Sequence, residues 1–257
     1  GNYTSNGVEN GYYEQAEKVV RMALAIITSL GTVMIPRISL LFSEKRYDLI
    51  HKYIHFSYRF TFMISIPIMF GIIGVSKNFV PVFFGQGYDK ICLLLPIYSC
   101  IILFVSVSNV TGCQLLIPAK RQNIYTIAVT ISAVLNFLLN IFLIPMYFSI
   151  GAAIASVIAE FAGSAFMLFY IQYRRLIHVK EVIIDSKNYW IAALIMFGLE
   201  LLLSEFFKVS VTNLLLQILG GIILYCLIVI ILKDSLFLEL YNNFTRRIKN
   251  ENKIKNY

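Results

Sequence analysis

Charged residues are scarce in this sequence: they make up 14% of 257 residues, whereas soluble domains carry about 25%. Hydrophobic residues account for 58%, and the mean hydropathy is +0.75. Apolar runs of about 20 residues recur, and a helix of that length crosses the hydrocarbon core of a bilayer. The shortage of charge excludes an ordinary soluble domain and predicts an all-α polytopic membrane protein.

Cysteine and histidine are also few, with four and three residues respectively. The cysteines lie in or beside apolar runs without a CxxC pair, so neither a disulfide framework nor a zinc site is predicted. His51 and His55 share a helix face, but no Glu lies between them and no third ligand is evident. Nothing resembles a nucleophile–base pair or a phosphate-binding loop. We therefore predict that the chain is no enzyme and holds no metal or cofactor.

The apolar runs predict about seven transmembrane helices joined by short connections. They cover about residues 16–41, 54–75, 91–112, 123–145, 150–173, 189–206 and 212–232. Seven spans place the two chain ends on opposite sides of the membrane.

The net charge of +8 could indicate a nucleic-acid partner, but the basic residues are distributed as in a membrane topology. Fifteen Lys and Arg lie in the tail and the loops of one side, against Lys77, Lys90 and Lys208 on the other. This asymmetry predicts a multi-pass protein with a cytoplasmic C-terminus, an external residue 1 and no nucleic-acid partner. Because no signal peptide or initiator Met precedes this external end, we expect the chain to be the C-terminal part of a longer protein.

The tail and two arginines are predicted to meet the cytoplasmic membrane surface. Arg37 and Arg59, near the ends of spans, are expected to anchor at the headgroups. One helical face of the tail is apolar and consists of Leu236, Phe237, Leu240, Tyr241 and Phe244. Basic residues follow this face, which suits either a helix lying in the interface or a partly disordered basic tail.

The first span opens with ionisable residues, in the stretch GYYEQAEKVVRM. On a helix, one polar stripe is formed by Glu14, Lys18, Arg21, Thr28, Ser29 and Thr32. Burying such charges in hydrocarbon costs roughly 2.5–3.5 kcal/mol each. The apolar remainder, residues 22–36, spans about 22 Å, which is short of a core near 30 Å. Snorkelling at the membrane edge is one interpretation, and a water-filled cavity that marks a substrate pathway is the other.

Two later spans carry polar residues as well. Glu160 lies near the middle of the fifth span, too deep to snorkel, and is either an ion- or proton-coupling group or a structural buried acid. Asn136 and Asn140 lie four residues apart in the fourth span, where they favour inter-helix hydrogen bonds or contacts with a polar substrate.

Two stretches resemble one known family. "GYYEQAEKVVRM…SLGTVMIPRIS" is similar to the second helix of the C-terminal lobe in bacterial polysaccharide transporters. "LIPAKRQNIYT…NFLLNIFLIPMYFSIGAAIASVIAEF" is similar to the Asn-rich helix, Ile-Pro turn and Gly-Ala-Ala helix that follow. These are the O-antigen- and capsule-type flippases of the superfamily that also contains multidrug/toxin extrusion transporters and the peptidoglycan-precursor flippase. The resemblance covers about residues 7–175, and departs at Phe148–Ser149, where the family often has a Gly-containing turn.

The resemblance implies the partial C-terminal lobe of a two-lobe, fourteen-helix transporter. Residues 1–175 would form this lobe without its first helix, residues 176–233 an additional pair of transmembrane helices, and residues 234–257 a basic cytoplasmic tail. The two lobes would surround a cavity that opens alternately to each side. The missing N-terminal lobe of the same polypeptide would therefore be a partner of the chain.

The same resemblance implies that the protein flips undecaprenyl-pyrophosphate-linked oligosaccharide across the bacterial cytoplasmic membrane for surface polysaccharide synthesis. The implied substrate-binding residues are Lys18, Arg21, Glu14, Thr28, Asn136 and Asn140. Lys18 and Arg21 match cationic cavity residues by position and type, and would bind the pyrophosphate. Glu14 would hold Lys18 or Arg21 in place or moderate their charge, while the hydroxyl and amide groups would suit sugars.

Two other classes compete with a flippase. An ion-coupled multidrug or cation antiporter of the same superfamily would use acidic residues, for which Glu160 is the best support. A non-transporting scaffold or receptor would have little use for a charged stripe that penetrates the membrane.

Overall fold

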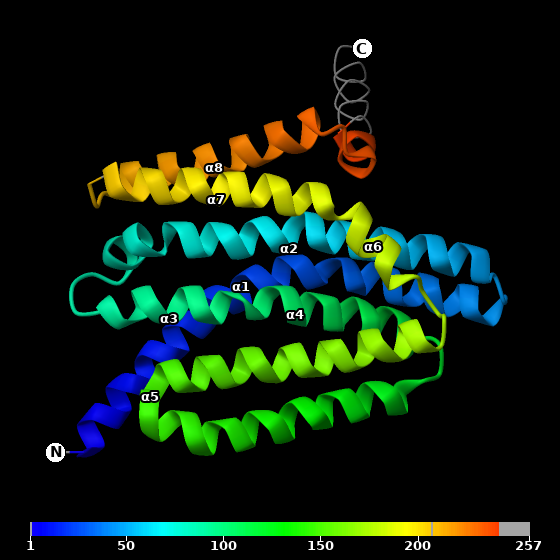
Figure 1. The fold of residues 1–257 in the computed structure, drawn as a ribbon, viewed down its shortest axis with the longest axis horizontal. Helices are drawn as coiled ribbons and strands as arrows, with labels where there is room; N and C mark the ends of the chain where they lie inside the picture. Colours follow the sequence, from blue (N-terminus) through cyan, green and yellow to red (C-terminus); the bar gives the residue numbers. More distant parts are fainter. Residues whose placement is uncertain (1, 207, 242–257) are drawn as a thin grey trace, which may run out of the picture.

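The structure is a computed structural model that describes residues 2–206 and 208–241, with side chains from residue 7 onward. Its elements are α1 (Asn2–Ser43), α2 (Tyr47–Phe83), α3 (Asp89–Ser99), α4 (Ile101–Ser108), the π-helix η1 (Asn109–Leu116), α5 (Gln122–Tyr173), α6 (Val179–Asp185), α7 (Lys187–Phe206) and α8 (Val211–Ile231). The long helices run roughly side by side in one bundle, with α7 and α8 along one edge (Figure 1).

Six helical segments in the described residues are long and apolar enough to cross a membrane. They are Gly7–Ser43, Tyr47–Phe83, Asp89–Leu116, Gln122–Tyr173, Lys187–Phe206 and Val211–Ile231. The predicted all-α membrane fold is confirmed. The prediction of about seven spans and the six segments differ at α5, which contains two predicted spans.

α5 is a hairpin of two arms that lie side by side (Figure 1). Phe148 has φ 52° and ψ −127°, which are not helical angles, so the chain reverses there. Between the arms, the Ser132 hydroxyl donates to the carbonyl of Ala159 at 2.9 Å. Gly163 lets the arms approach, because a Cβ there would lie 2.0 Å from the Ser132 hydroxyl oxygen. The arms therefore correspond to the predicted spans 123–145 and 150–173.

The third predicted span is one helical segment whose hydrogen-bond pattern changes twice, at Cys100 and at the start of η1. Pro96 lies inside α3 and removes one backbone donor, and the α-helical pattern is interrupted at Cys100. The segment then continues through α4 into η1, where the amide of Ile117 donates to the carbonyl of Gly112, five residues back. Such wide turns are often found at functional sites.

α2 is the central helix, since it contacts α1, α3, α4, α7 and α8. The α7–α8 pair packs against it through a cluster of buried side chains that includes Met63, Ile66, Met196 and Val229. Tyr225 of α8 also donates its hydroxyl to the carbonyl of Met63 at 2.8 Å. This contact fixes the additional helix pair beside the remaining bundle.

Four helices end in the same turn, and each turn has a basic residue in the left-handed conformation. Lys45, Lys120, Arg175 and Lys233 have φ of 55°, 58°, 52° and 52°. In each case the left-handed residue and the residue after it donate their amides back to the last helical turn, which is the Schellman pattern. All four turns lie at one end of the bundle (Figure 1). The basic loops predicted to share one side are thus together, and their cations lie near helix C-termini, where they are stabilising.

The segment after α8 contacts the bundle and gives Arg59 a partner that the sequence did not predict. The side chain of Arg59 is 16% exposed and pairs with Asp234 at 2.9 Å. Residues 235–241 are helical, with Leu236 buried and with Phe237 and Leu240 packed against the α2–α7–α8 cluster. Phe244 and the basic residues of the tail lie outside the described residues.

Candidate functional site

The polar stripe of α1 lies on the surface of the bundle. Ala16, Val20 and Ile27 form the buried face of this helix, with exposed fractions of 0%, 0% and 3%. The opposite face carries the exposed side chains of Glu14, Lys18, Arg21, Ala25, Ser29 and Thr32. α1 is therefore an apolar helix with one exposed polar face.

Arg21 is held by an acid one helical turn before it. Its Nε and Nη2 donate to Oε1 of Glu17 at 2.8 and 2.6 Å, and 73% of its side chain is exposed. The predicted partner of the cations was Glu14, so the structure corrects the choice of acid for Arg21. Within the described side chains, no ion pair is found for Lys18 or Glu14. Lys18 is therefore the less restrained of the two cations.

The hydroxyls of the stripe are partly used by the helix itself. Thr28 is half-buried and donates to the carbonyl of Leu24 at 2.9 Å. Ser29 and Thr32 donate to carbonyls three residues earlier, at 2.6 and 2.7 Å. Their hydrogens are thereby occupied, while lone pairs on the oxygens remain able to accept hydrogen bonds.

Asn136 and Asn140 belong to a chain of hydrogen bonds that joins α1 to both arms of α5. Asn140 donates to Oδ1 of Asn136 at 2.9 Å, and Asn136 donates to the hydroxyl of Ser156 at 3.2 Å. That hydroxyl lies 3.2 Å from the hydroxyl of Tyr13 on α1. The buried Oδ1 of Asn140 has no partner within the described residues. Inter-helix hydrogen bonding thus occurs, and one acceptor remains available.

Glu160 lies in a separate polar pocket of 270 Å³ between η1 and the two arms of α5. Its polar lining residues include Asn109, Cys113, Tyr125 and Ser132. Neither cation of the α1 stripe lines this pocket, so the structure does not bring Glu160 together with Lys18 and Arg21. No group of three or more potential metal-ligating side chains occurs among the described residues.

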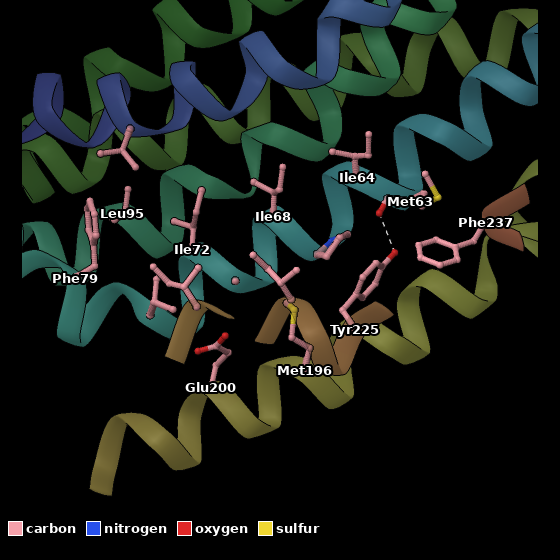
Figure 2. Close-up of a pocket in the computed structure, with 16 residues that line it drawn as sticks. Met63, Ile64, Ile68, Ile72, Phe79, Leu95, Met196, Glu200, Tyr225 and Phe237 are labelled. Carbon is pink, nitrogen blue, oxygen red and sulfur yellow. Dashed lines mark hydrogen bonds between the residues drawn. The ribbon is translucent and has the colours of Figure 1, made fainter. Parts of the chain in front are cut away.

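A long apolar groove follows α2 and is covered on one side by α7 and α8 (Figure 2). Its volume is 480 Å³, and its walls include Ile64, Ile68, Ile72 and Phe79. The groove also touches α1 through Val19. Val19 lies about 100° around the helix from Lys18, so the groove meets α1 on a different face from the cationic stripe.

Sequence reasoning missed Glu200, which lines this groove from α7 and is 1% exposed. The available signal was a single acid in the run IAALIMFGLELLL, within the sixth predicted span. An ionisable group at such a position is by default a candidate functional residue.

Six candidate membrane spans, an exposed cationic stripe and an apolar groove define a polytopic helical membrane protein. The profile of the family described as Lipid II flippase MurJ matches residues 5–220. The chain belongs to this family of flippases, which are transporters and not enzymes. The predicted flippase resemblance is confirmed at this level.

Similar proteins agree with this assignment. The probable low-salt glycan biosynthesis flippase of Haloferax volcanii is 26% identical over 149 residues, covering 58% of this chain and 31% of the relative. The membrane protein YabM of Bacillus subtilis is 26% identical over 160 residues, covering 62% and 29%. The structure of lipid II flippase MurJ in an inward closed conformation matches with a TM-score of 0.71 and 23% identity, over 86% of this chain and 46% of that chain. This likeness shows the fold, and the chain spans less than half the length of each of these proteins.

Proposed function

We propose that the chain forms one wall of a flippase that moves an undecaprenyl-pyrophosphate-linked oligosaccharide across the bacterial cytoplasmic membrane. The observation that carries this proposal is the exposed pair Lys18 and Arg21 on an otherwise apolar helix. A pyrophosphate carries several negative charges, and Arg and Lys bind phosphate through charge-assisted hydrogen bonds. Alternating access would expose this cationic face to each side in turn.

The sugars of such a substrate would meet the polar groups beside the stripe. The unpartnered Oδ1 of Asn140 can accept a hydrogen bond from a sugar hydroxyl, as can the oxygens of Thr28 and Thr32. Asn136 is already bonded to Asn140 and Ser156, so it would act by positioning Asn140.

The lipid chain of the substrate would follow the apolar groove. The groove is lined by aliphatic and aromatic side chains and reaches α1 at Val19. A polyisoprenyl chain has no hydrogen-bonding groups and gains about 25 cal/mol for each Å² of apolar surface removed from water. The chain would therefore bind on a different face of α1 from the stripe that binds the headgroup.

The other wall of the cavity would come from an N-terminal lobe of the same polypeptide. Beside the stripe, α1 exposes Met22, Ile26 and Val33 by 70%, 63% and 67%. These apolar side chains suit contact with a second lobe or with lipid. The gathered basic turns would face the cytoplasm under the positive-inside rule, which places the C-terminus there.

Surface polysaccharide repeat units and peptidoglycan precursor share the pyrophosphate-linked polyisoprenyl carrier, and the stripe would recognise this shared part. We propose a surface polysaccharide unit as the substrate on the sequence resemblance. The second candidate, a cation antiporter, is favoured by one observation: the polar pocket around Glu160 contains an acid without a described basic partner.

The test replaces Lys18 and Arg21 together by Ala in the native gene, with Lys208→Ala as the matched control on an exposed loop. We expect the double variant to retain lipid-linked oligosaccharide on the cytoplasmic leaflet, measured by its protection from an externally added glycan-modifying enzyme. The control should behave as the wild type. Normal external exposure of the glycan in the double variant would contradict the proposal, and peptidoglycan precursor as the retained lipid would reassign the glycan.

A further inference from the structure

The carboxyl group of Glu200 projects into the apolar groove between α2, α7 and α8 (Figure 2). Its side chain is 1% exposed, and its Oε2 has no hydrogen-bond partner among the described residues. A buried carboxylate oxygen without a partner is costly, and buried polar groups in native proteins are nearly always bonded. This oxygen therefore requires a partner from outside the described chain.

The neighbouring helices leave room for this side chain at two glycines. A Cβ on Gly221 of α8 would lie 2.0 Å from Oε1 of Glu200, and a Cβ on Gly74 of α2 would lie 2.5 Å from its Cβ. Gln217 donates to the backbone carbonyl of Glu200 at 2.9 Å, and Asn78 donates to Gln217 at 2.9 Å. Residues of α2, α7 and α8 thus together form the space that holds Glu200.

No basic side chain of the surrounding helices neutralises Glu200. On α2, Lys77 donates to Glu205 at 2.6 Å, and both side chains are exposed. On α8, the stretch Val211–Ile231 contains no Lys, Arg or His. On α7, the basic residue Lys187 lies at the opposite end of the helix from Glu200. The groove therefore presents one unmatched acid within apolar walls.

We propose that this groove binds a lipophilic ammonium ion, whose N–H group donates to Oε2 of Glu200 while its apolar body packs against the groove. An ammonium group supplies the positive charge and the donor that the site lacks, and a charge-assisted bond is strong where water is excluded. Walls that include Ile68, Ile72 and Phe79 suit an alkyl or aromatic body, and the volume of 480 Å³ admits one. The ammonium ion would occupy the same groove as the proposed lipid chain of the substrate, so the two ligands would compete for it.

The first test uses dodecylammonium as the probe and dodecan-1-ol as its neutral counterpart. Native mass spectrometry of the 257-residue chain, purified in detergent, reports the bound fraction of each. We expect Glu200→Gln to weaken dodecylammonium binding by about tenfold or more, because it removes a charge-assisted hydrogen bond. Glu205→Gln, which changes an exposed acid on the same helix, should leave binding unchanged. Binding that is equal in Glu200→Gln and wild type, or equally strong for dodecan-1-ol, would overturn the proposal.

The second test needs no variant and so does not depend on whether Glu200→Gln folds. Dicyclohexylcarbodiimide is an apolar reagent that adds to carboxyl groups in water-poor surroundings, and peptide mapping locates the adduct. We expect it to label Glu200, and we expect dodecylammonium, but not dodecan-1-ol, to slow the labelling. An unreactive Glu200, or one labelled at the same rate with dodecylammonium present, would contradict a groove site for ammonium ions.

Discussion

The guanidinium of Arg59 and the carboxylate of Asp234 form a partly buried ion pair at 2.9 Å, although they lie 175 residues apart in the sequence. The same carboxylate accepts the hydroxyl of Tyr189 at 2.9 Å and the amide of Phe237 at 3.0 Å. It thereby joins α2, α7 and the helical segment after α8.

Removing Asp234 should therefore loosen the end of the bundle. We expect Asp234→Ala to lower the free energy of unfolding by about 3–5 kcal/mol, because it leaves the partly buried charge of Arg59 without a partner. Glu205→Ala breaks the exposed pair with Lys77 and should change the free energy of unfolding by less than about 1 kcal/mol. Denaturant unfolding in detergent measures both values. Equal and small effects of the two changes would show that Asp234 does not hold the segment.

The role of Arg59 illustrates what the sequence could not predict. The apolar runs predicted the helices, and the position of Arg59 near the end of one run predicted only that it lies at the membrane edge. Its partner Asp234 follows the last span, and no local spacing connects residues so far apart. The acid Glu200 stands alone in an apolar run and could have been found from the sequence, but the glycines and amides around it come from α2 and α8, which no local spacing connects to it.

The hairpin of α5 depends on Gly151, three residues after the turn at Phe148. A Cβ on Gly151 would lie 2.2 Å from the carbonyl oxygen of Leu143, and backbone atoms move less easily than side chains. We expect Gly151→Ala to destabilise the protein by about 1–3 kcal/mol, as other overpacked substitutions do. Gly198→Ala is the matched control, since nothing lies within 4 Å of its Cβ position. It should be neutral or stabilise helix α7 by up to about 1 kcal/mol. Thermal unfolding of the two variants compares them, and similar losses would refute the role of the turn.

Phe148 occupies a conformation that a glycine would adopt more easily. Its φ of 52° with ψ of −127° is strained for a residue with a side chain. We expect Phe148→Gly to raise the unfolding free energy by about 1 kcal/mol, reduced by the lost contact with the ammonium of Lys90, 5.4 Å from its ring. Phe148→Ala, which keeps the strain and loses the ring, separates these effects. Destabilisation by both substitutions would mean that the ring contributes more than the strain.

The charges of the α1 stripe show a different limit of the sequence argument. The helical arc of Glu14, Lys18 and Arg21 was sufficient to place them on one exposed face. The pairing of Arg21 with Glu17 was also readable, because acids and bases four residues apart on a helix commonly interact. The shared helical arc suggested Glu14 as the acid beside Arg21. The acid that lies four residues before Arg21 is Glu17, and this is the one that pairs with it.

The pairing with Glu17 predicts how the stripe responds to a single neutralised acid. Both donors of Arg21 that the structure shows bonded reach Glu17, so Glu17→Gln should free them for a pyrophosphate. We expect binding of undecaprenyl pyrophosphate to the purified chain to strengthen by about twofold, the scale of an exposed helix pair. Glu14→Gln removes the same charge from the same face without touching this pair, so its effect should be smaller. If both changes strengthen binding equally, the cause is the removal of a negative charge near the stripe and not the release of Arg21 from Glu17.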